Sequence, residues 1–367
     1  MVDPRLTKLA DLLVNYSVEL QPGEWTMIRA EVVALPLARE VYRAVLQAGG
    51  YPLLNLYDEE SSLISARYAS DEQLTWISPM EKLMVEELDV LIALRATNNT
   101  RAMTNVDPAR MAKAQAARRE LSARQMARTA AGEFKWTLTQ YPTQASAQEA
   151  EMSLSEYEDF IFGATFCDRD DPVAEWNRVS EMQQRMVDWL KGKQHVTVRS
   201  ANCDLSLSIE GREFINSNGK KNMPSGEIFT GPVEESVNGW VRFTYPAIYQ
   251  GRSVEDVELR FENGRVVEAS ASKNEDFLLT QLNIDEGARY LGEFAIGTNF
   301  GIQKFTGNIL FDEKIGGTIH MALGRSYPET GGKNQSAIHW DMICDMRAGG
   351  EIHVDGELFY KDGEFVV

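Results

Sequence analysis

The spacing of the apolar residues changes near the middle of this 367-residue chain. Up to about residue 192, apolar residues recur at helical spacing between short strand-like runs. From there on they alternate with polar residues, as in DLSLSI and VELRFENGRVVEASAS. A period near 3.6 indicates helices with one apolar face, whereas a period of two indicates strands with one buried face. We therefore expect two domains, residues 1–192 and residues 193–367.

The first domain is predicted to be an α/β scaffold built on a parallel sheet. Helical and strand-like runs alternate along it, at residues 5–18, 25–28, 36–48, 51–56, 78–87, 89–94, 107–129 and 134–138. This order is typical of a parallel sheet covered by helices. Further helical runs follow between residues 153 and 191. The first 150 residues contain neither GxGxxG nor GxxxxGKS or GxxxxGKT, so we expect a scaffold without a dinucleotide site.

The second domain is predicted to be β-rich, of the α+β type, with mostly antiparallel strands. Three dipeptides that favour tight turns stand within its alternating runs: Asn263-Gly264, Asp355-Gly356 and Asp362-Gly363. Asn-Gly and Asp-Gly suit two-residue hairpins, in which both central residues adopt a positive φ. Each dipeptide therefore predicts a hairpin.

The overall charge limits the class of partner. The formal net charge of −18 would repel nucleic acid and anionic membranes at long range. The N-terminal region lacks the basic start and apolar run of a signal peptide, and no window approaches 18 apolar residues. Three widely separated cysteines, Cys167, Cys203 and Cys344, form no CxxC pair. We therefore expect a cytoplasmic protein with reduced cysteines.

The stretch from Gly316 to Cys344 holds two of the four histidines, His320 and His339, and places Asp341 two residues after the second. Residues i and i+2 of a strand point to the same face, so His339 and Asp341 can present an imidazole and a carboxylate to one point. The glycines and the proline between the histidines favour a loop that returns His320 to His339. We predict a divalent-metal site here. The alternative is two unrelated core histidines beside a solvated aspartate.

Three glutamates of the second domain lie in unusual settings. Glu227 stands where a turn leads into an apolar strand, and Glu293 lies in the apolar run YLGEFAIGTN. A buried carboxylate is costly unless a cation or a donor pairs with it, and a metal ion would supply that cation. The alternative places each on an exposed edge strand. Glu313, in ILFDEKIGG, also suits an ordinary surface turn.

Longer strings resemble one enzyme family. The M29 metalloaminopeptidases, the thermophilic aminopeptidase T group, have strings in the same order that are similar to PSGEIFTGPVEESVNG, LGEFAIGTN, ILFDEKIGGTIHMALGRSYPETGGKN and SAIHWDMICD. The likeness extends over nearly the whole chain. It implies an α/β N-terminal domain and a metal-carrying C-terminal domain. It also implies a cytoplasmic, usually homodimeric enzyme that removes N-terminal residues from short peptides with a free N-terminus.

The resemblance further implies the residues of the site. Two divalent metal ions, zinc, cobalt or manganese, would share the carboxylate of Glu293. The ligands that match by position are Glu227, Glu293, Glu313, His320, His339 and Asp341, and Tyr327 matches the active-site tyrosine. The spacing from Glu313 to His320 differs from that of some members, which leaves open whether Glu313 is a ligand.

From this set we expect a two-metal peptidase. Such ions would lower the pKa of a bound water and polarise the scissile carbonyl. Tyr327 would donate a hydrogen bond to the oxyanion. Glu293, or a neighbouring carboxylate, would carry a proton to the leaving amine.

Two other functions remain open at this point. A mononuclear iron ring-cleaving dioxygenase would use His320, His339 and Asp341 as a triad of two histidines and one carboxylate. Such an enzyme would not need Glu227 and Glu293, which favours the peptidase. A non-catalytic metal-binding protein is the second alternative.

Overall fold

The computed structural model describes residues 3–367, and the chain divides into two compact units. The first unit comprises the described residues up to Val173 together with Gly219–Met223. The second unit comprises Ala174–Asn218 and Pro224–Val367. The division falls within helix α10 (Pro172–Leu190), whereas the sequence analysis placed a domain boundary after this helix, at residue 192. Most of α10 belongs with the second unit because its C-terminal half contributes to the hydrophobic core there.

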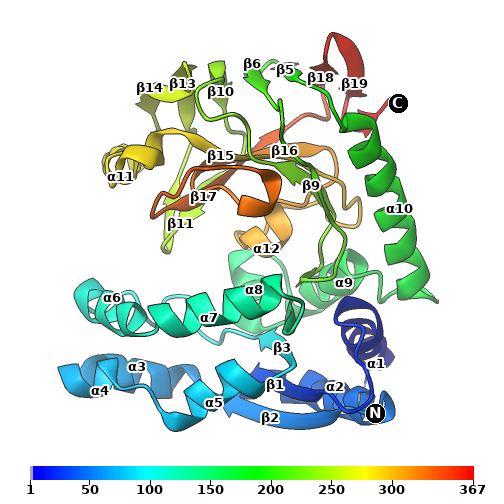
Figure 1. Cartoon of the computed structure of the whole chain (residues 1–367), viewed down its shortest axis with the longest axis vertical. Coiled ribbons are helices and arrows are strands. Elements are labelled where there is room, and N and C mark those ends of the chain that lie inside the picture. The colour runs from blue at the N-terminus through cyan, green and yellow to red at the C-terminus, as the bar shows by residue number, and fades with distance from the viewer. Residues whose placement is uncertain (1–2) are drawn as a thin grey trace. The chain divides into compact units, whose positions relative to one another are not determined.

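A five-stranded parallel sheet forms the centre of the first unit, in the strand order β2-β1-β3-β4-β8 (Figure 1). Its strands are β1 (Trp25–Glu31), β2 (Tyr51–Tyr57), β3 (Val90–Arg95), β4 (Lys135–Gln140) and β8 (Asn222–Met223). The predicted α/β class with a parallel sheet is confirmed for this part of the chain.

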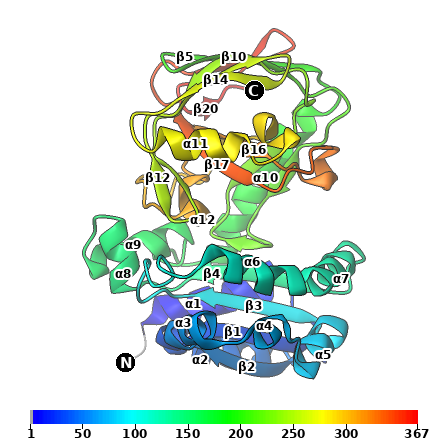
Figure 2. The same cartoon turned by 90° about the vertical axis from the view of Figure 1, so that its left-hand side faces the viewer.

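Helices surround this sheet. Helix α2 packs on β1 and β2 with α1 against it, while α6 packs on α4 and α7 packs on α5 (Figure 2). The helices of this unit are α1 (Pro4–Asp11), α2 (Leu35–Gln47), α3 (Glu59–Tyr68), α4 (Asp71–Thr75), α5 (Pro79–Glu87), α6 (Pro108–Ala117), α7 (Arg119–Ala130), α8 (Gln144–Glu149) and α9 (Leu154–Ala164).

Two of the predicted helix starts have well-formed caps. The Ser78 hydroxyl accepts a hydrogen bond from the backbone N–H of Glu81, and the Glu81 carboxylate accepts one from the backbone N–H of Ser78. This reciprocal capping box begins α5. Asp107 caps α6 directly before Pro108, which fits the first helical turn because it lacks the N–H that would stay unpaired there.

The first unit departs from the sequence prediction at several places. The single helix expected for residues 107–129 is two helices, because the backbone at Arg118 leaves the helical region (φ −94°, ψ 5°). At this break the Arg118 guanidinium donates to the Glu81 carboxylate. Helices α3, α4 and α8 were not predicted. In α3 only Leu63 and Ala66 are buried, so the segment lacks the apolar stripe by which a helix is recognised.

The second unit is built from antiparallel sheets, with α10 (Pro172–Leu190), α11 (Glu275–Leu282) and α12 (Ile309–Asp312) beside them (Figure 1). The eight-stranded sheet has the order β14 (Arg265–Ser270), β13 (Glu258–Glu262), β10 (Asn238–Arg242), β6 (Cys203–Ser208), β5 (His195–Ser200), β18 (Glu351–Val354), β19 (Glu357–Lys361), β20 (Glu364–Phe365). The five-stranded sheet has the order β17 (His339–Asp345), β16 (Thr318–Gly324), β15 (Leu291–Gly297), β9 (Glu227–Thr230), β7 (Ile215–Ser217). A separate ribbon joins β11 (Ala247–Tyr249) and β12 (Arg252–Val254). The predicted β-rich class is confirmed.

The three predicted hairpin turns are present. They connect β13 to β14, β18 to β19 and β19 to β20, each through a two-residue loop. Both loop residues have positive φ in every case, for example 47° at Asn263 and 80° at Gly264. This is the backbone that a tight hairpin with the right-handed twist of its strands requires.

One face of the five-stranded sheet belongs to the hydrophobic core of the second unit. Alternate residues of strands β15, β16 and β17 are buried in that core, among them Phe294, Ile296, Met321, Trp340 and Met342. Because the side chains of a strand alternate between faces, the residues between these point to the opposite face of the sheet.

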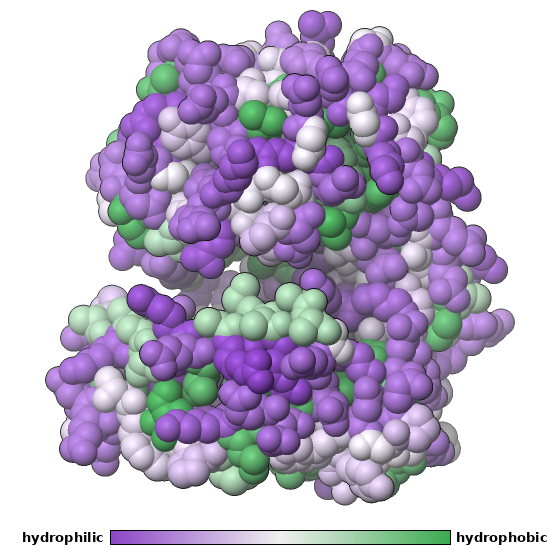
Figure 3. Space-filling view, in the orientation of Figure 1, coloured by the Kyte–Doolittle hydropathy of each residue, from purple (hydrophilic) through white to green (hydrophobic). Residues whose placement is uncertain are grey.

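The surface fits the composition. Hydrophilic residues predominate on the face drawn in Figure 3, as the net charge of −18 leads one to expect. Between residues 3 and 367, none of the helices combines the length and the apolar character that crossing a membrane would require.

The hairpin glycines allow a test of the fold. We expect Gly264→Ala to destabilise the protein more than Gly356→Ala, although both residues have a positive φ of similar size, 80° and 83°. Each substitution forces an L-residue into the left-handed region, which costs about 1–2 kcal/mol. A Cβ at Gly264 would also lie 1.8 Å from the carbonyl oxygen of Glu234, whereas one at Gly356 would meet nothing within 4 Å. Urea unfolding of both variants measures the difference, and equal losses would contradict the close approach.

Candidate metal centre

Five of the predicted ligands lie on one face of the five-stranded sheet. Glu293 of β15 pairs with Ala322 of β16, which pairs in turn with Asp341 of β17. Directly paired residues of antiparallel strands point to the same face. His320 and His339 each stand two residues from a member of this row, so they point the same way. This is the face opposite the hydrophobic core.

Glu227 completes the group from the neighbouring strand. It is the first residue of β9 and pairs with Gly297, which stands four residues after Glu293 and therefore on the same face. The positions between the larger side chains hold small residues, namely Ala295, Gly297, Ala322 and Gly324. Their size leaves room for the acidic and imidazole groups to approach one another.

Glu293 is shared between two groups of donor atoms. Nε2 of His320 lies 3.5 Å from Oε2 of Glu227 and 3.4 Å from Oε1 of Glu293. Nε2 of His339 lies 3.2 Å from Oε2 of Glu293 and 3.4 Å from Oδ1 of Asp341. Within each group the donor atoms lie within 4.8 Å of one another. Ligands about 2.1 Å from one ion are separated by about 3–4 Å, so each group has suitable dimensions for an ion.

Glu313 and Lys314 reach this cluster from the segment after α12. Glu313 forms a third donor group with His320 and Asp341. Its side chain is 15% exposed, which does not match the surface turn considered from the sequence. The Lys314 side chain is fully buried, contacts the Glu313 carboxylate, and places Nζ 3.7 Å from Oε1 of Glu227.

Lys314 was missed by the sequence analysis. A lysine next to an acid is usually a solvated surface pair, and the string DEK gave no reason to interpret it otherwise. The only signal was the apolar sequence on both sides, ILF before and IGG after.

Burial and charge act in opposite directions on the groups around His320. Burial alone raises the pKa of Glu293, but its hydrogen bonds to His320 and His339 hold that pKa below the usual range. Burial lowers the pKa of His320, but the hydrogen bond to Glu293 and the charge of Glu227 outweigh it and raise this pKa to about 9. In the absence of metal, protons on the imidazoles therefore compensate part of the carboxylate charge.

Burial and charge also shift pKa values in opposite directions in the rest of the cluster. Burial raises the pKa of Asp341, but the adjacent His339 lowers it to about 2. Burial lowers the pKa of His339, yet the charge of Asp341 and hydrogen bonds to both acids raise it to about 12. Burial raises the pKa of Glu313 to about 7, although the charge of Lys314 opposes this shift. A divalent ion would take the place of such protons, so the cluster is suited to bind cations.

Two further observations fit metal ligation. Nδ1 of His339 lies 2.8 Å from the carbonyl oxygen of Arg325, which can only accept a hydrogen bond, so Nδ1 carries a proton. Nε2 faces the acids and could ligate an ion once its own proton is lost. Oε2 of Glu227 is buried and accepts no hydrogen bond from any residue in the range 3–367. Carboxylate and imidazole donors together suit zinc, cobalt and manganese.

Tyr327 stands at the exposed side of the cluster. It follows β16, and its ring lies edge-on to those of His339 and Phe229, at centroid distances of 5.1 and 5.4 Å. The residue is 41% exposed, in contrast to 1% for His320. Desolvation, followed by the negative charges of Glu293 and its neighbours, raises the pKa of Tyr327 above its usual range. All seven predicted site residues are thus brought to one region of the second unit.

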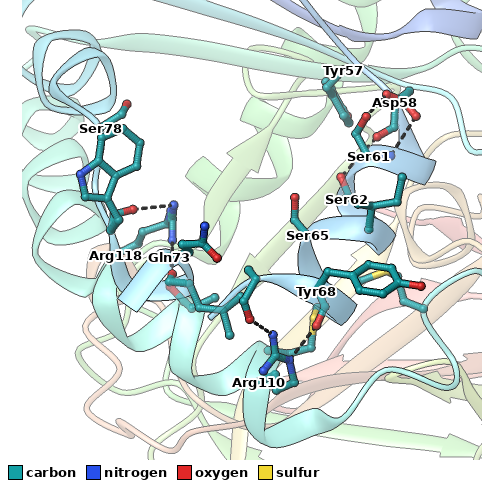
Figure 4. Close-up of a pocket in the computed structure, with 18 of the residues that line it drawn as sticks. Tyr57, Asp58, Ser61, Ser62, Ser65, Tyr68, Gln73, Ser78, Arg110 and Arg118 are labelled. Carbon is teal, nitrogen blue, oxygen red and sulfur yellow. Dashed lines mark hydrogen bonds between the residues drawn. The ribbon is translucent and has the colours of Figure 1, made fainter. Parts of the chain in front are cut away.

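A cavity in the first unit contains none of these residues. It has a volume of about 1090 Å³ and is lined by helices α3, α4 and α6, with Tyr57, Tyr68 and Arg110 among its side chains (Figure 4). Arg110 donates to the carbonyl oxygen of Ala66, so its charge already serves a helix end. The groups of acids and histidines that could hold a metal ion, among residues 3–367, lie in the second unit.

Comparison with known proteins gives a consistent result. The chain is 29% identical to Aminopeptidase 2 of Geobacillus stearothermophilus, an alignment that covers 99% of this chain and 95% of that protein. It is 28% identical to Aminopeptidase T of Thermus aquaticus, over 98% of this chain and 95% of that protein. The solved structure of wild-type AmpT from Thermus thermophilus has the same fold, with a TM-score of 0.85, 24% identity and 99% coverage of both chains.

A family model decides the assignment. The model for the thermophilic metalloproteases M29 matches residues 2–365, which is nearly the whole chain. The resemblance and the enzyme class predicted from the sequence are therefore confirmed. The chain belongs to the M29 family of metallopeptidases, hydrolases that cleave peptide bonds.

Proposed function

We propose that this protein is an aminopeptidase that removes N-terminal residues from short peptides and uses two divalent ions, zinc, cobalt or manganese. The observation that carries this proposal is the shared position of Glu293 between two donor groups. One group adds Glu227 and His320, and the other adds His339 and Asp341. These residues would hold the two ions, which would supply a position for the substrate amine and activation of the carbonyl.

The ions, when bound, would lower the pKa of a water molecule and polarise the scissile carbonyl. The chain's own groups supply the rest of the mechanism. Exposure rises from His320, at 1%, through the His339 side chain, at 24%, to Tyr327, at 41%, which marks the side from which a peptide enters. Tyr327 stands there with a hydroxyl that can donate to the oxyanion. Glu293, between the two histidines, is our candidate for the proton transfer to the leaving amine.

The geometry disfavours the dioxygenase alternative. That enzyme would hold one iron with His320, His339 and Asp341. Among residues 3–367, the close donor groups that contain Asp341 include either His339 or His320, each with a glutamate, and none includes both histidines. Glu293 stands between the histidines, 3.4 Å from one and 3.2 Å from the other. To bind one iron with all three ligands, the site would have to accommodate Glu293 between the two histidines, although such a reaction does not use this acid.

We further propose a cytoplasmic homodimer, as the family resemblance implies. Free cysteines at residues 167, 203 and 344, all buried, fit a reducing compartment. Light scattering of the purified protein would measure the oligomeric state.

The first prediction concerns the shared carboxylate. Glu293→Gln should lower the content of both metal ions, because a neutral amide is a poor ligand for either position. Metal analysis after dialysis at a fixed free-metal concentration measures this. Glu268→Gln, at a surface residue paired with Arg260, is the matched control and should keep the wild-type content. A Glu293→Gln variant that retained both ions would refute the shared role.

The second prediction concerns the tyrosine. Tyr327→Phe should lower kcat by about 10²-fold, with KM and metal content little changed, because it removes a donor that acts in the transition state. Steady-state kinetics on an aminoacyl p-nitroanilide gives both constants. Tyr68→Phe, at an exposed tyrosine of the first unit, is the control. A near-normal kcat would leave Tyr327 with a packing role only.

The third prediction tests the function itself. A free peptide should be trimmed from its N-terminus and the same peptide with an acetylated N-terminus left intact, because acetylation removes the amine that would bind metal. Mass spectrometry of the matched pair follows the cleavage. A chelator should abolish trimming and added Zn²⁺, Co²⁺ or Mn²⁺ should restore it. Equal cleavage of both peptides, or cuts at internal bonds, would overturn the assignment, and bound metal without any cleavage would favour a non-catalytic binding protein.

A further inference from the structure

Lys314 is a buried cation inside a cluster of acids and histidines. Its side chain has no exposed surface, and it touches the carboxylate of Glu313. Its Nζ also lies 3.7 Å from Oε1 of Glu227. Because no part of the side chain reaches solvent, Lys314 does not contact a substrate. Its influence acts through the carboxylates beside it.

The backbone fixes this lysine against the metal-binding face. The carbonyl oxygen of Lys314 accepts a hydrogen bond from the N–H of Asn299, at 3.1 Å. The next residue, Ile315, passes so close to the sheet that a Cβ on Gly297 would lie 2.3 Å from its carbonyl oxygen. Gly297 is the partner of Glu227 in the sheet. The segment that carries Lys314 is therefore held beside Glu227 by a contact that only glycine permits.

The charges of the site are uneven once this lysine is counted. The donor groups contain four carboxylates, Glu227, Glu293, Glu313 and Asp341, and two neutral imidazoles complete the set when metal is bound. Two divalent ions would by themselves balance four carboxylates. Lys314 adds a further positive charge that cannot move to solvent. The second ion to enter therefore meets one net negative charge where it would otherwise meet two, and the filled site carries an excess of one positive charge.

The excess acts mainly on one of the two positions. Glu227, in the group with Glu293 and His320, is within ion-pair distance of Lys314. The group formed by Glu293, His339 and Asp341 has no residue within that distance of Lys314 among those described for residues 3–367. The position beside Glu227 therefore shares its carboxylate with an ammonium group, and the position beside His339 does not.

We propose that Lys314 is a fixed internal cation of the metal centre that makes the two positions unequal, so that the position at His339 and Asp341 fills first and the position at Glu227 and His320 binds its ion more weakly. This inference rests on the proposed two-metal function. Lys314 acts on the ions through its fixed charge and does not itself contact a substrate. It also stabilises the metal-free fold by pairing with acids that would otherwise be buried alone.

Titration of metal-free protein with Co²⁺ against a chromophoric chelator tests the proposal. The wild-type chain should bind one ion tightly and a second at least about ten-fold more weakly, given the size of charge repulsion at such distances. Lys314→Met, which keeps most of the length of the side chain without its charge, should tighten the second ion by about ten-fold or more. Its metal-free form should also melt at a lower temperature than metal-free wild type.

The proposal predicts that Lys314→Met raises the affinity for the second ion and lowers the melting temperature. A packing role does not predict changes in opposite directions. If Lys314 served only to hold the fold, Lys314→Met would lower both the melting temperature and the affinity for Co²⁺, and that result would overturn the inference. Lys361→Met, at an exposed lysine paired with Glu351, is the control and should change neither quantity.

Two further measurements guard against ambiguity. Lys314→Gln keeps a donor for Glu313 without the charge, and it replaces Lys314→Met if that variant does not fold. Equal affinities for the two ions in wild type would overturn the inference alone and leave the two-metal function intact. A wild-type chain that bound no divalent ion would overturn both.

Discussion

The concentration of negative charge on one face of a buried sheet is the constraint on which the site depends. Glu227 and Glu293 are only 5% and 4% exposed, and an isolated carboxylate at such a depth costs several kcal/mol. The structure compensates this charge with His320, His339 and Lys314, each within 4 Å of at least one acid. These positive groups offset the carboxylate charge when no metal is bound. Divalent ions would offset the same charge, and this requirement for compensating positive charge makes the site suited to them.

A sheet can carry such a charged cluster because its two faces can hold side chains of different chemical character. Strands β15, β16 and β17 direct one set of side chains, such as Phe294, Met321 and Trp340, into the hydrophobic core. The alternate set carries the acids and histidines. Rigid packing on the first face fixes the strand register, and the register determines which donors stand opposite each other on the second. A shift of one residue would move His320 and Asp341 into the core.

The small residues between the donors are as important as the donors. Ala322 separates Glu293 from Asp341 along one row of the sheet, and Gly297 stands opposite Glu227. Gly297 also admits the segment after α12, which brings Glu313 and Lys314 into the cluster. This segment differs from the strands because its position follows from a close backbone approach and has no periodic pattern in the sequence. The spacing of residues in the sequence therefore gave no indication that Lys314 belongs to the cluster.

The sequence by itself determined the class of each half of the chain, the three hairpins and the face shared by His339 and Asp341, because these follow from local periodicity and turn chemistry. Glu227 and Glu293 were noted for their apolar surroundings, but the resemblance to a family was needed to join them with His320 into one ligand set, since no spacing along the chain relates Glu227 to Glu293 or to His320. Only the tertiary structure decided how these residues meet, where α10 packs, and that Lys314 is buried among the acids. Strand order and register set those contacts between residues far apart in the chain, and the free energy that fixes them comes from packing of the whole core.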